Sequence, residues 1–412
     1  MDLFGVRVVV RVGATAAALA FVLGGVAIGT LSGLTPGLHV NTLALLLATA
    51  APLVPGPPHL VGAAMLAAGV VHSFLDVVPA LAFGVPDAAM AMSALPGHRL
   101  VIEGQGREAL RLSALGSGGA VLCALPLSLP LTALMTSLYP TIRAHLPVLL
   151  GAVVAFLLLT EGSTVARVGA VIALLSSGLL GVLALDLHPA APLPVGGTLS
   201  PLFAGLFGAP VLVDALDGGT VPPQGDTTIT VDPPEVGIAT VAGSLAGAVV
   251  GYVPGVSSAI AAVLALTALP SQADDRSFVV ATSGVNTANT VFALFALLAL
   301  GTPRTGVLVA FDRASLPLNV PLLFASVGFA AASGFLLVLV VGDRYLSAVS
   351  RLDYRRLSLA ILALLVCLAG LFAGLVGVGV FLASALVGLI PPRFGARRVY
   401  LMGVLLVPLS LP

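Results

Sequence analysis

The motif GxxxGxxPG occurs twice inside very apolar segments of this chain, first at residues 29–37 and again at residues 247–255. Its three glycines and its proline recur together, each 218 residues later. Proline lacks the amide donor that a helix needs, and the following glycine lets the chain turn, so each copy is expected to end a helix. Lipid cannot satisfy the backbone groups that such a break frees. Paired breaks therefore predict helices that are interrupted beside a protein-lined cavity, a feature typical of transporter binding sites.

Composition places the chain in the membrane. Of its 412 residues, 58 % are hydrophobic and only 8 % are charged, which excludes a soluble domain of this length. The net charge of zero argues against a basic surface for nucleic acid. The two cysteines, Cys123 and Cys367, exclude a disulfide framework and a CxxC metal site, and we expect no metal ion or cofactor apart from a coupling ion.

Hydrophobic runs predict an all-α polytopic protein with about ten to twelve transmembrane segments in two related, inverted repeats. The repeats occupy residues 1–186 and 236–412. Between them, residues 187–235 form an acidic linker rich in proline and glycine, whose apolar stretch 201–216 resembles a re-entrant segment.

The lengths of several runs predict broken elements. The runs at 38–54 and 256–269 are short for a crossing and fit half-helices or hairpins. The run at 359–390 would span about 48 Å as one helix, against a hydrocarbon core of about 30 Å. We expect this run to break near Gly374–Gly379.

Arginine positions predict the orientation of the chain. Arg7 and Arg11 precede an apolar run that continues into the first motif, which indicates a retained first helix with a cytoplasmic N-terminus rather than a signal peptide. The arm at 96–119 carries Arg99, Arg107 and Arg111 and is expected to be an amphipathic segment on the cytoplasmic interface. The linker at 187–235 has no arginine and is expected on the extracytoplasmic side of the membrane.

A further sequence match between the two halves places small polar side chains at equal depth in both. Gly84 and Pro86 recur as Gly301 and Pro303, 217 residues later, and this register pairs His72 with Asn289 and Ser73 with Thr290. Burying such groups costs about 1–3 kcal/mol each unless they are hydrogen-bonded, so a cluster beside broken helices indicates a solute or ion site. The candidate substrate and ion residues are Gly33, Pro36, Gly37, His39, Asn41, His72, Ser73, Asp76, Gly251, Pro254, Gly255, Ser257, Ser258, Asn286, Asn289 and Thr290.

Each candidate also has a structural interpretation. The serines and Thr290 could cap helices, the asparagines could join helices, and the glycines could allow close helix packing. Asp76 lies four residues after His72 on one helical face, which suggests a proton or cation relay, although a helix ending near Pro79 would bring Asp76 to the interface. Helices beginning after Gly37 and Gly255 would direct amides at an anion, and carbonyls at the breaks could hold Na⁺.

Several motifs resemble those of one family, the large permease subunit of tripartite tricarboxylate transporters (TctA-like), especially its shorter archaeal branch. They include GTLSGLTPGLHVNT at the first break, LPGHRLVIEGQG in the arm and SGVNTANTVFALFALLALGTPR in the second half. The resemblance implies ion-driven uptake of small organic anions, such as di- and tricarboxylates, across the cell membrane. It also implies an extracytoplasmic solute-binding protein and a small membrane subunit as partners, and it places substrate and ion at Pro36–Gly37 and Pro254–Gly255.

The resulting prediction is a secondary-active permease, not an enzyme, that alternates access about the two PG loops and is coupled to Na⁺ or protons. A translocator of a lipid-linked phosphate carrier is the alternative. An arginine at the site would favour this alternative, and Arg304 is the nearby candidate. An intramembrane aspartyl protease is disfavoured because the GxGD that such chemistry needs is absent.

Overall fold

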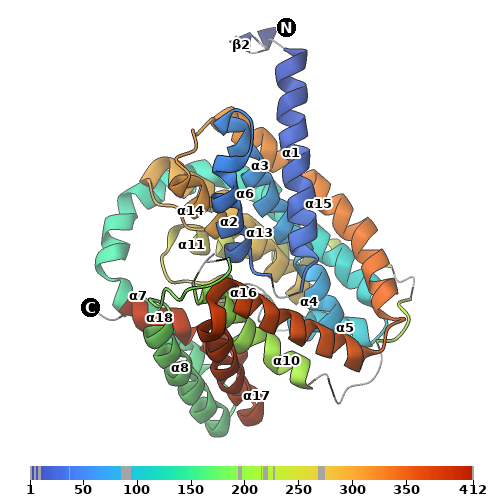
Figure 1. The fold of residues 1–412 in the computed structure, drawn as a ribbon, viewed down its shortest axis with the longest axis vertical. Helices are drawn as coiled ribbons and strands as arrows, with labels where there is room; N and C mark the ends of the chain where they lie inside the picture. Colours follow the sequence, from blue (N-terminus) through green and yellow to red (C-terminus); the bar gives the residue numbers. More distant parts are fainter. Residues whose placement is uncertain are drawn as a thin grey trace.

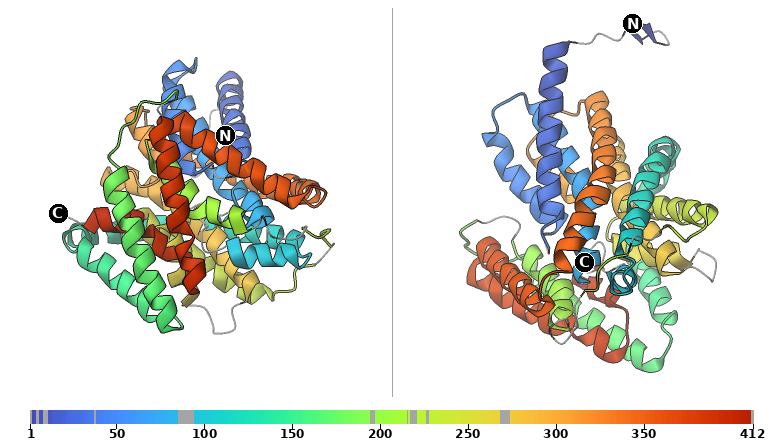
Figure 2. Two further views of the ribbon diagram at one scale, coloured as in Figure 1. Left: turned by 60° about the horizontal axis from the view of Figure 1, so that its bottom comes forward. Right: turned by 90° about the vertical axis from the view of Figure 1, so that its right-hand side faces the viewer.

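In the residues that it describes, the secondary structure of the computed structural model is helical apart from one short strand pair near the N-terminus (Figure 1). It describes residues 2–3, 6–7, 11–36, 38–84, 94–193, 197–214, 216, 221–225, 228–267 and 274–410. Strands β1 (Asp2–Leu3) and β2 (Val6–Arg7) pair antiparallel beyond the free end of α1, away from the helical body (Figures 1 and 2).

Helices of very different length follow each other along the chain. The first part contains α1 (Val12–Gly33), α2 (Val40–Ala50), η1 (Ala51–Leu53), α3 (Pro58–Leu75), α4 (Val77–Phe83), α5 (Ala94–Ile102), α6 (Gly106–Ala144), α7 (Leu146–Leu159) and α8 (Thr164–Ala184). The middle contains α9 (Leu199–Phe203), the π-helical turn η3 (Ala204–Gly208) and α10 (Ala209–Asp214). The second part contains α11 (Pro233–Tyr252), α12 (Ser258–Thr267), α13 (Asp275–Leu300), α14 (Gly306–Arg313), α15 (Val320–Val349), α16 (Tyr354–Gly388), α17 (Ile390–Phe394), η5 (Arg398–Met402) and α18 (Gly403–Ser410).

Eight of the described helices are long and apolar enough to cross a membrane, with α3 and α4 counted as one and α16 and α17 as one. Four shorter apolar helices accompany them, among them the segments 40–53 and 199–214. The prediction of an all-α polytopic membrane protein is confirmed. The expected ten to twelve crossings included short runs, and the structure forms these as helices of 10–17 residues.

The glycines of the repeated motif bring helices together in both halves. A Cβ at Gly29 of α1 would collide with the backbone of Ala68 in α3. In the second half, a Cβ at Gly247 of α11 would lie 2.7 Å from the Cβ of Ala288 in α13. Small residues at a helix contact permit this close approach of backbones, so α1 packs on α3 as α11 packs on α13. That the two repeats are inverted stays a prediction.

The sequence match between Gly84 and Gly301 also has a structural basis. Helix α4 ends at Gly84 with φ +65°, and α13 ends at Gly301 with φ +61°. Both residues adopt the left-handed conformation that commonly closes a helix and that favours glycine. The two glycines that match in sequence therefore perform the same backbone function.

The break predicted in the run at 359–390 is confirmed. Ala373 (φ −138°, ψ 18°) and Gly374 (φ 58°, ψ −155°) leave the helical conformation inside α16. Beyond this break α16 packs on the linker segment α9–η3–α10, where Gly205 approaches the carbonyl of Phe381 and Gly388 approaches that of Leu206. The predicted re-entrant stretch 201–216 thus forms buried short helices in its described part, and its path through the bilayer stays a prediction.

The linker folds against the arm, a contact that the arginine pattern did not predict. Gln224 accepts a hydrogen bond from Gly106 N (2.7 Å) and donates one to Val101 O (3.0 Å), and Thr230 N donates to Glu108 (2.7 Å). The arm and this end of the linker therefore lie side by side, whereas the arginine pattern assigned them to opposite faces of the membrane. The face of the membrane on which each lies stays a prediction. Counting arginines cannot reveal that two segments of opposite charge fold together.

The arm is also not an interfacial helix throughout. From Gly106 onward it forms the first turns of α6, where Glu108 and Leu112 are fully buried. Arg276 at the start of α13 pairs with Glu108 at 3.2 Å. The helical spacing of its charges was recognised correctly, but these charges face protein partners.

Candidate functional site

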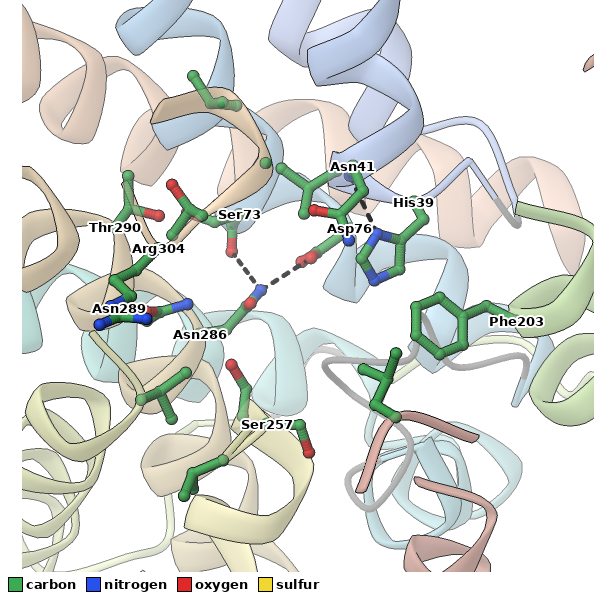
Figure 3. A pocket seen from close by; sticks show the side chains of 18 of the residues that line it. His39, Asn41, Ser73, Asp76, Phe203, Ser257, Asn286, Asn289, Thr290 and Arg304 are labelled. Atoms are coloured by element: carbon green, nitrogen blue, oxygen red, sulfur yellow. Dashed lines mark hydrogen bonds between the residues drawn. The ribbon is translucent and has the colours of Figure 1, made fainter. Parts of the chain in front are cut away.

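A cavity of about 250 Å³ lies where elements of both halves converge (Figure 3). It is bounded by the N-termini of α2 and α12, the C-terminal part of α3, the middle of α13 and the loop before α14. Eleven of the predicted site residues line it: His39, Asn41, His72, Ser73, Asp76, Gly255, Ser257, Ser258, Asn286, Asn289 and Thr290. Residues separated by about half of the chain thus share one polar space.

The carboxylate of Asp76 is held at the junction between the halves. Asp76 is only 6 % exposed, so the helix does not end at an interface there. Asn286 Nδ2 donates to Asp76 Oδ2 at 2.8 Å and to the carbonyl of Ser73 at 3.3 Å (Figure 3). One amide of α13 therefore bridges the carboxyl group of Asp76 and a backbone oxygen near the end of α3.

His72 lies one helical turn before Asp76 and is fully buried. Its Nδ1 is 3.0 Å from the hydroxyl of Ser32 on α1. Its Nε2 is buried and has no hydrogen-bond partner in the described part of the chain. A buried ring nitrogen of this kind favours a polar ligand or water, because an unsatisfied nitrogen costs free energy.

The two short helices begin at the cavity wall in similar ways. His39 Nδ1 accepts from Asn41 N at 3.0 Å and caps α2, while Ser257 Oγ accepts from Ile260 N at 3.3 Å at the start of α12. The capping interpretation therefore holds for Ser257, and it coexists with a place on the cavity wall. Since helix N-termini carry partial positive charge, both short helices contribute positive potential to the cavity.

Arg304 lines the cavity, although it was not among the predicted permease residues. Its Nη2 donates to the hydroxyl of Tyr139, and its Cζ lies 5.2 Å from the centre of the Tyr139 ring. Its Nε is buried without a hydrogen-bond partner among the residues that the structure describes. The sequence signal was an arginine three residues after the helix-ending glycine of α13, which we associated with the lipid-carrier alternative.

Phe203 is a second residue that sequence reasoning missed. It belongs to α9 in the linker, and its ring lies 5.2 Å from that of His39 (Figure 3). No local pattern marks Phe203, because its place on the cavity depends on how the linker folds back.

Four predicted residues lie elsewhere, and a fifth is not described. Gly33, Pro36, Gly251 and Pro254 are not part of the described cavity wall, and Gly37 falls outside the described residues. A Cβ at Gly33 would lie 2.8 Å from the Cβ of Leu75, and one at Gly251 would lie 2.7 Å from the Cβ of Phe292. The glycines before each break thus pack helices. Gly255 does line the cavity, and its φ of +79° requires a glycine-like backbone.

Comparison with known proteins agrees with the architecture. The sequence model of the tripartite tricarboxylate transporter TctA family matches residues 19–403. The chain is also 26 % identical over 405 residues to an uncharacterized protein of the archaeon Methanocaldococcus jannaschii, covering 95 % of this chain and 97 % of that protein. No solved structure matches it. The chain therefore belongs to the tripartite tricarboxylate transporter TctA family, a family of membrane transport proteins.

Proposed function

We propose that this protein is a secondary-active permease of the cell membrane that carries small organic anions, of the di- and tricarboxylate class, through the central cavity. The observation that carries the proposal is the meeting, in one buried polar space, of two capped helix N-termini and Arg304. These groups are the ones that a carboxylate requires. A cavity of about 250 Å³ suits a small solute.

Recognition of the anion is assigned to Arg304 together with the neutral donors around it. A guanidinium can hold a carboxylate through two parallel hydrogen bonds, and the buried, unpartnered Nε of Arg304 leaves one donor for such a ligand. Asn41 and Asn289, on the cavity wall, supply amide donors. Figure 3 shows Asn289 and Arg304 at one side of the cavity and His39 and Phe203 at the other.

Coupling is assigned to Asp76. An ionisable side chain within a membrane-spanning segment is costly and indicates a functional site. A cation, either Na⁺ or a proton, would neutralise this carboxylate while the anion binds nearby. The hydrogen bond from Asn286 joins the two halves at the same point, so rocking of one repeat against the other would break or remake it.

Partners follow from the family. Members usually work in tripartite systems with a solute-binding protein and a small membrane subunit. We propose that this chain does the same, receiving its substrate from an extracytoplasmic binding protein.

A lipid-linked phosphate carrier is the second candidate substrate, and the observation that favours it is Arg304 itself. A guanidinium binds phosphate as readily as carboxylate. The two candidates therefore differ in the rest of the ligand, and transport measurements must include both.

The test uses purified protein in liposomes with labelled di- and tricarboxylates under imposed Na⁺ or proton gradients. We expect gradient-driven uptake that Arg304→Gln reduces by about tenfold or more and that Arg304→Lys partly retains, because a hydrogen bond to a charged group contributes about 1.5–3 kcal/mol. Arg355→Gln, at an exposed arginine that does not line this cavity, is the matched control. If no acid is taken up while a labelled polyprenyl phosphate crosses the bilayer, the carboxylate assignment is wrong.

A further inference from the structure

A second, larger cavity of about 750 Å³ adjoins the central one. It lies between α2, α14 and the residues that follow α8, and it shares Asn41, Arg304 and Gly306 with the central cavity. We refer to it as the outer cavity. Two cavities that share three residues form adjacent compartments along one route.

The outer cavity is basic. Arg304, Arg313 and His188 line it, and no acidic side chain is part of its described wall. Arg313 is exposed at the end of α14, and no ion pair involving it occurs among the described residues. Nearby Asp186 and Asp312 are exposed but do not belong to the cavity wall. The wall itself therefore carries two arginines and no carboxylate.

The contact between Asn41 and Gly306 separates the two compartments. A Cβ at Gly306 would lie 2.9 Å from the Cα of Asn41 and would collide with its side-chain oxygen. The N-termini of α2 and α14 thus touch without an intervening side chain. Arg304 lines both cavities beside this contact.

We propose that the outer cavity is a second anion-binding site, an entry vestibule that attracts the carboxylate substrate and passes it between Asn41 and Gly306 to the central site. This role rests on the proposed permease function. Clefts lined by one sign of charge raise the local concentration of opposite charge, and the Debye length of about 8 Å at physiological salt limits this effect to short range. Arg313 gathers the anion, and Arg304 contacts it from either compartment.

The first test changes the charge at position 313 in both directions. In a background with Cys123→Ala and Cys367→Ala, Arg313→Cys is measured before and after reaction with a cationic or an anionic methanethiosulfonate reagent. We expect the substrate concentration for half-maximal uptake to rise about fivefold in Arg313→Cys, because one charge near the anion contributes a factor of this size in water. The maximal rate should change less than twofold.

The cationic adduct should return the half-saturating substrate concentration to the value measured with Arg313, and the anionic adduct should raise this concentration further. Both effects should be smaller at high salt. Arg355→Cys, treated identically, is the control for surface charge in general. Equal responses to the two reagents at position 313, or the same responses at position 355, would overturn the proposal.

The second test measures binding without transport. The chain contains no tryptophan, so Leu187→Trp in the wall of the outer cavity is a unique fluorescent reporter. We expect citrate to change its emission in detergent micelles, and we expect Arg313→Gln to weaken that response several-fold. Leu122→Trp, exposed on α6 and outside both cavities, should not respond.

The fluorescence and uptake measurements together distinguish failure of this inference from failure of the proposed function. A citrate response at Leu187→Trp in a protein that takes up no acid would contradict the permease and retain the anion site. Uptake of acids with no response at Leu187→Trp, or with a response unaffected by Arg313→Gln, would retain the permease and remove the vestibule.

Discussion

The α1–α3 unit and the α11–α13 unit share a scaffold but differ in the chemistry that they bring to the cavity. Each packs a glycine-containing helix against a long helix and begins a short, capped helix at the cavity wall. The first unit supplies His39, His72 and Asp76, whereas the second supplies neutral amides and hydroxyls and is followed by Arg304. Helix packing is therefore the same in the two units, whereas the ionisable groups of the cavity differ. The carboxylate comes from one half and the guanidinium from the other.

The most severe test of the shared scaffold is to enlarge equivalent packing glycines. Gly25→Val and Gly243→Val would each drive a side chain into a backbone carbonyl of the facing helix, at Ala64 and Ala281. We expect each to destabilise the protein by about 3 kcal/mol or more, because overpacking a tight contact costs this much when the backbone must move. Size-exclusion chromatography after heating measures the folded fraction.

The controls for this pair lie on the same two helices. Gly24→Val in α1 and Gly237→Val in α11 add the same side chain where no atom lies within 4 Å, and both should remain folded. Loss of folding in only one member of the packing pair would show that the two units are not packed equivalently.

The division of charge is tested by comparing Asp76→Asn with Thr290→Ala. We expect Asp76→Asn to reduce uptake by about tenfold to a hundredfold and to abolish its dependence on the ion gradient, since the charge held by Asn286 is lost. Thr290→Ala should reduce uptake less than about threefold, the effect of one neutral hydrogen bond. Initial rates under imposed and collapsed gradients provide the comparison.

Asp353→Asn is the control for the loss of a carboxylate. Asp353 caps α16 at Arg356 N, away from both cavities, and asparagine caps a helix equally well. Gradient-dependent uptake that survives in Asp76→Asn would remove Asp76 from the coupling mechanism.

The smallest effects are expected at the caps of the two short helices. His39→Ala and Ser257→Ala should each cost about 1 kcal/mol of stability, with His39→Ala also losing the ring contact to Phe203. Both should lower uptake a few-fold because the helix ends form the cavity wall. Thermal denaturation and uptake are measured on the same preparations.

Ser163→Ala removes the cap of α8, where Ser163 Oγ accepts from Ala166 N at 3.1 Å, and Ser163 lines neither cavity. A similar loss of stability with normal uptake is expected. Equal loss of uptake in all three variants would mean that the caps of α2 and α12 act only through stability.

Local signals predicted much of the fold. Two pairs of matching glycines, Gly84 with Gly301 and Gly29 with Gly247, indicated equivalent helix ends and helix contacts, and the break at Gly374 followed from length alone. Residues near the breaks were sufficient to name eleven of the 22 residues of the cavity wall. The contact between the arm and the linker was not predicted, because these segments are far apart in sequence and pair only in the folded protein.

The sequence by itself indicated a helical membrane protein, and it predicted two related sets of broken helices with a polar site between them. Hydrophobicity, proline and glycine act within a few residues, so their consequences can be read from the chain. Only the tertiary structure decided that Arg304 and Phe203 join the site, that Gly33 and Gly251 pack helices, and that an outer basic cavity meets the central one at Gly306. These features depend on which helices pack side by side, and that is set by the shapes of whole surfaces rather than by any local pattern.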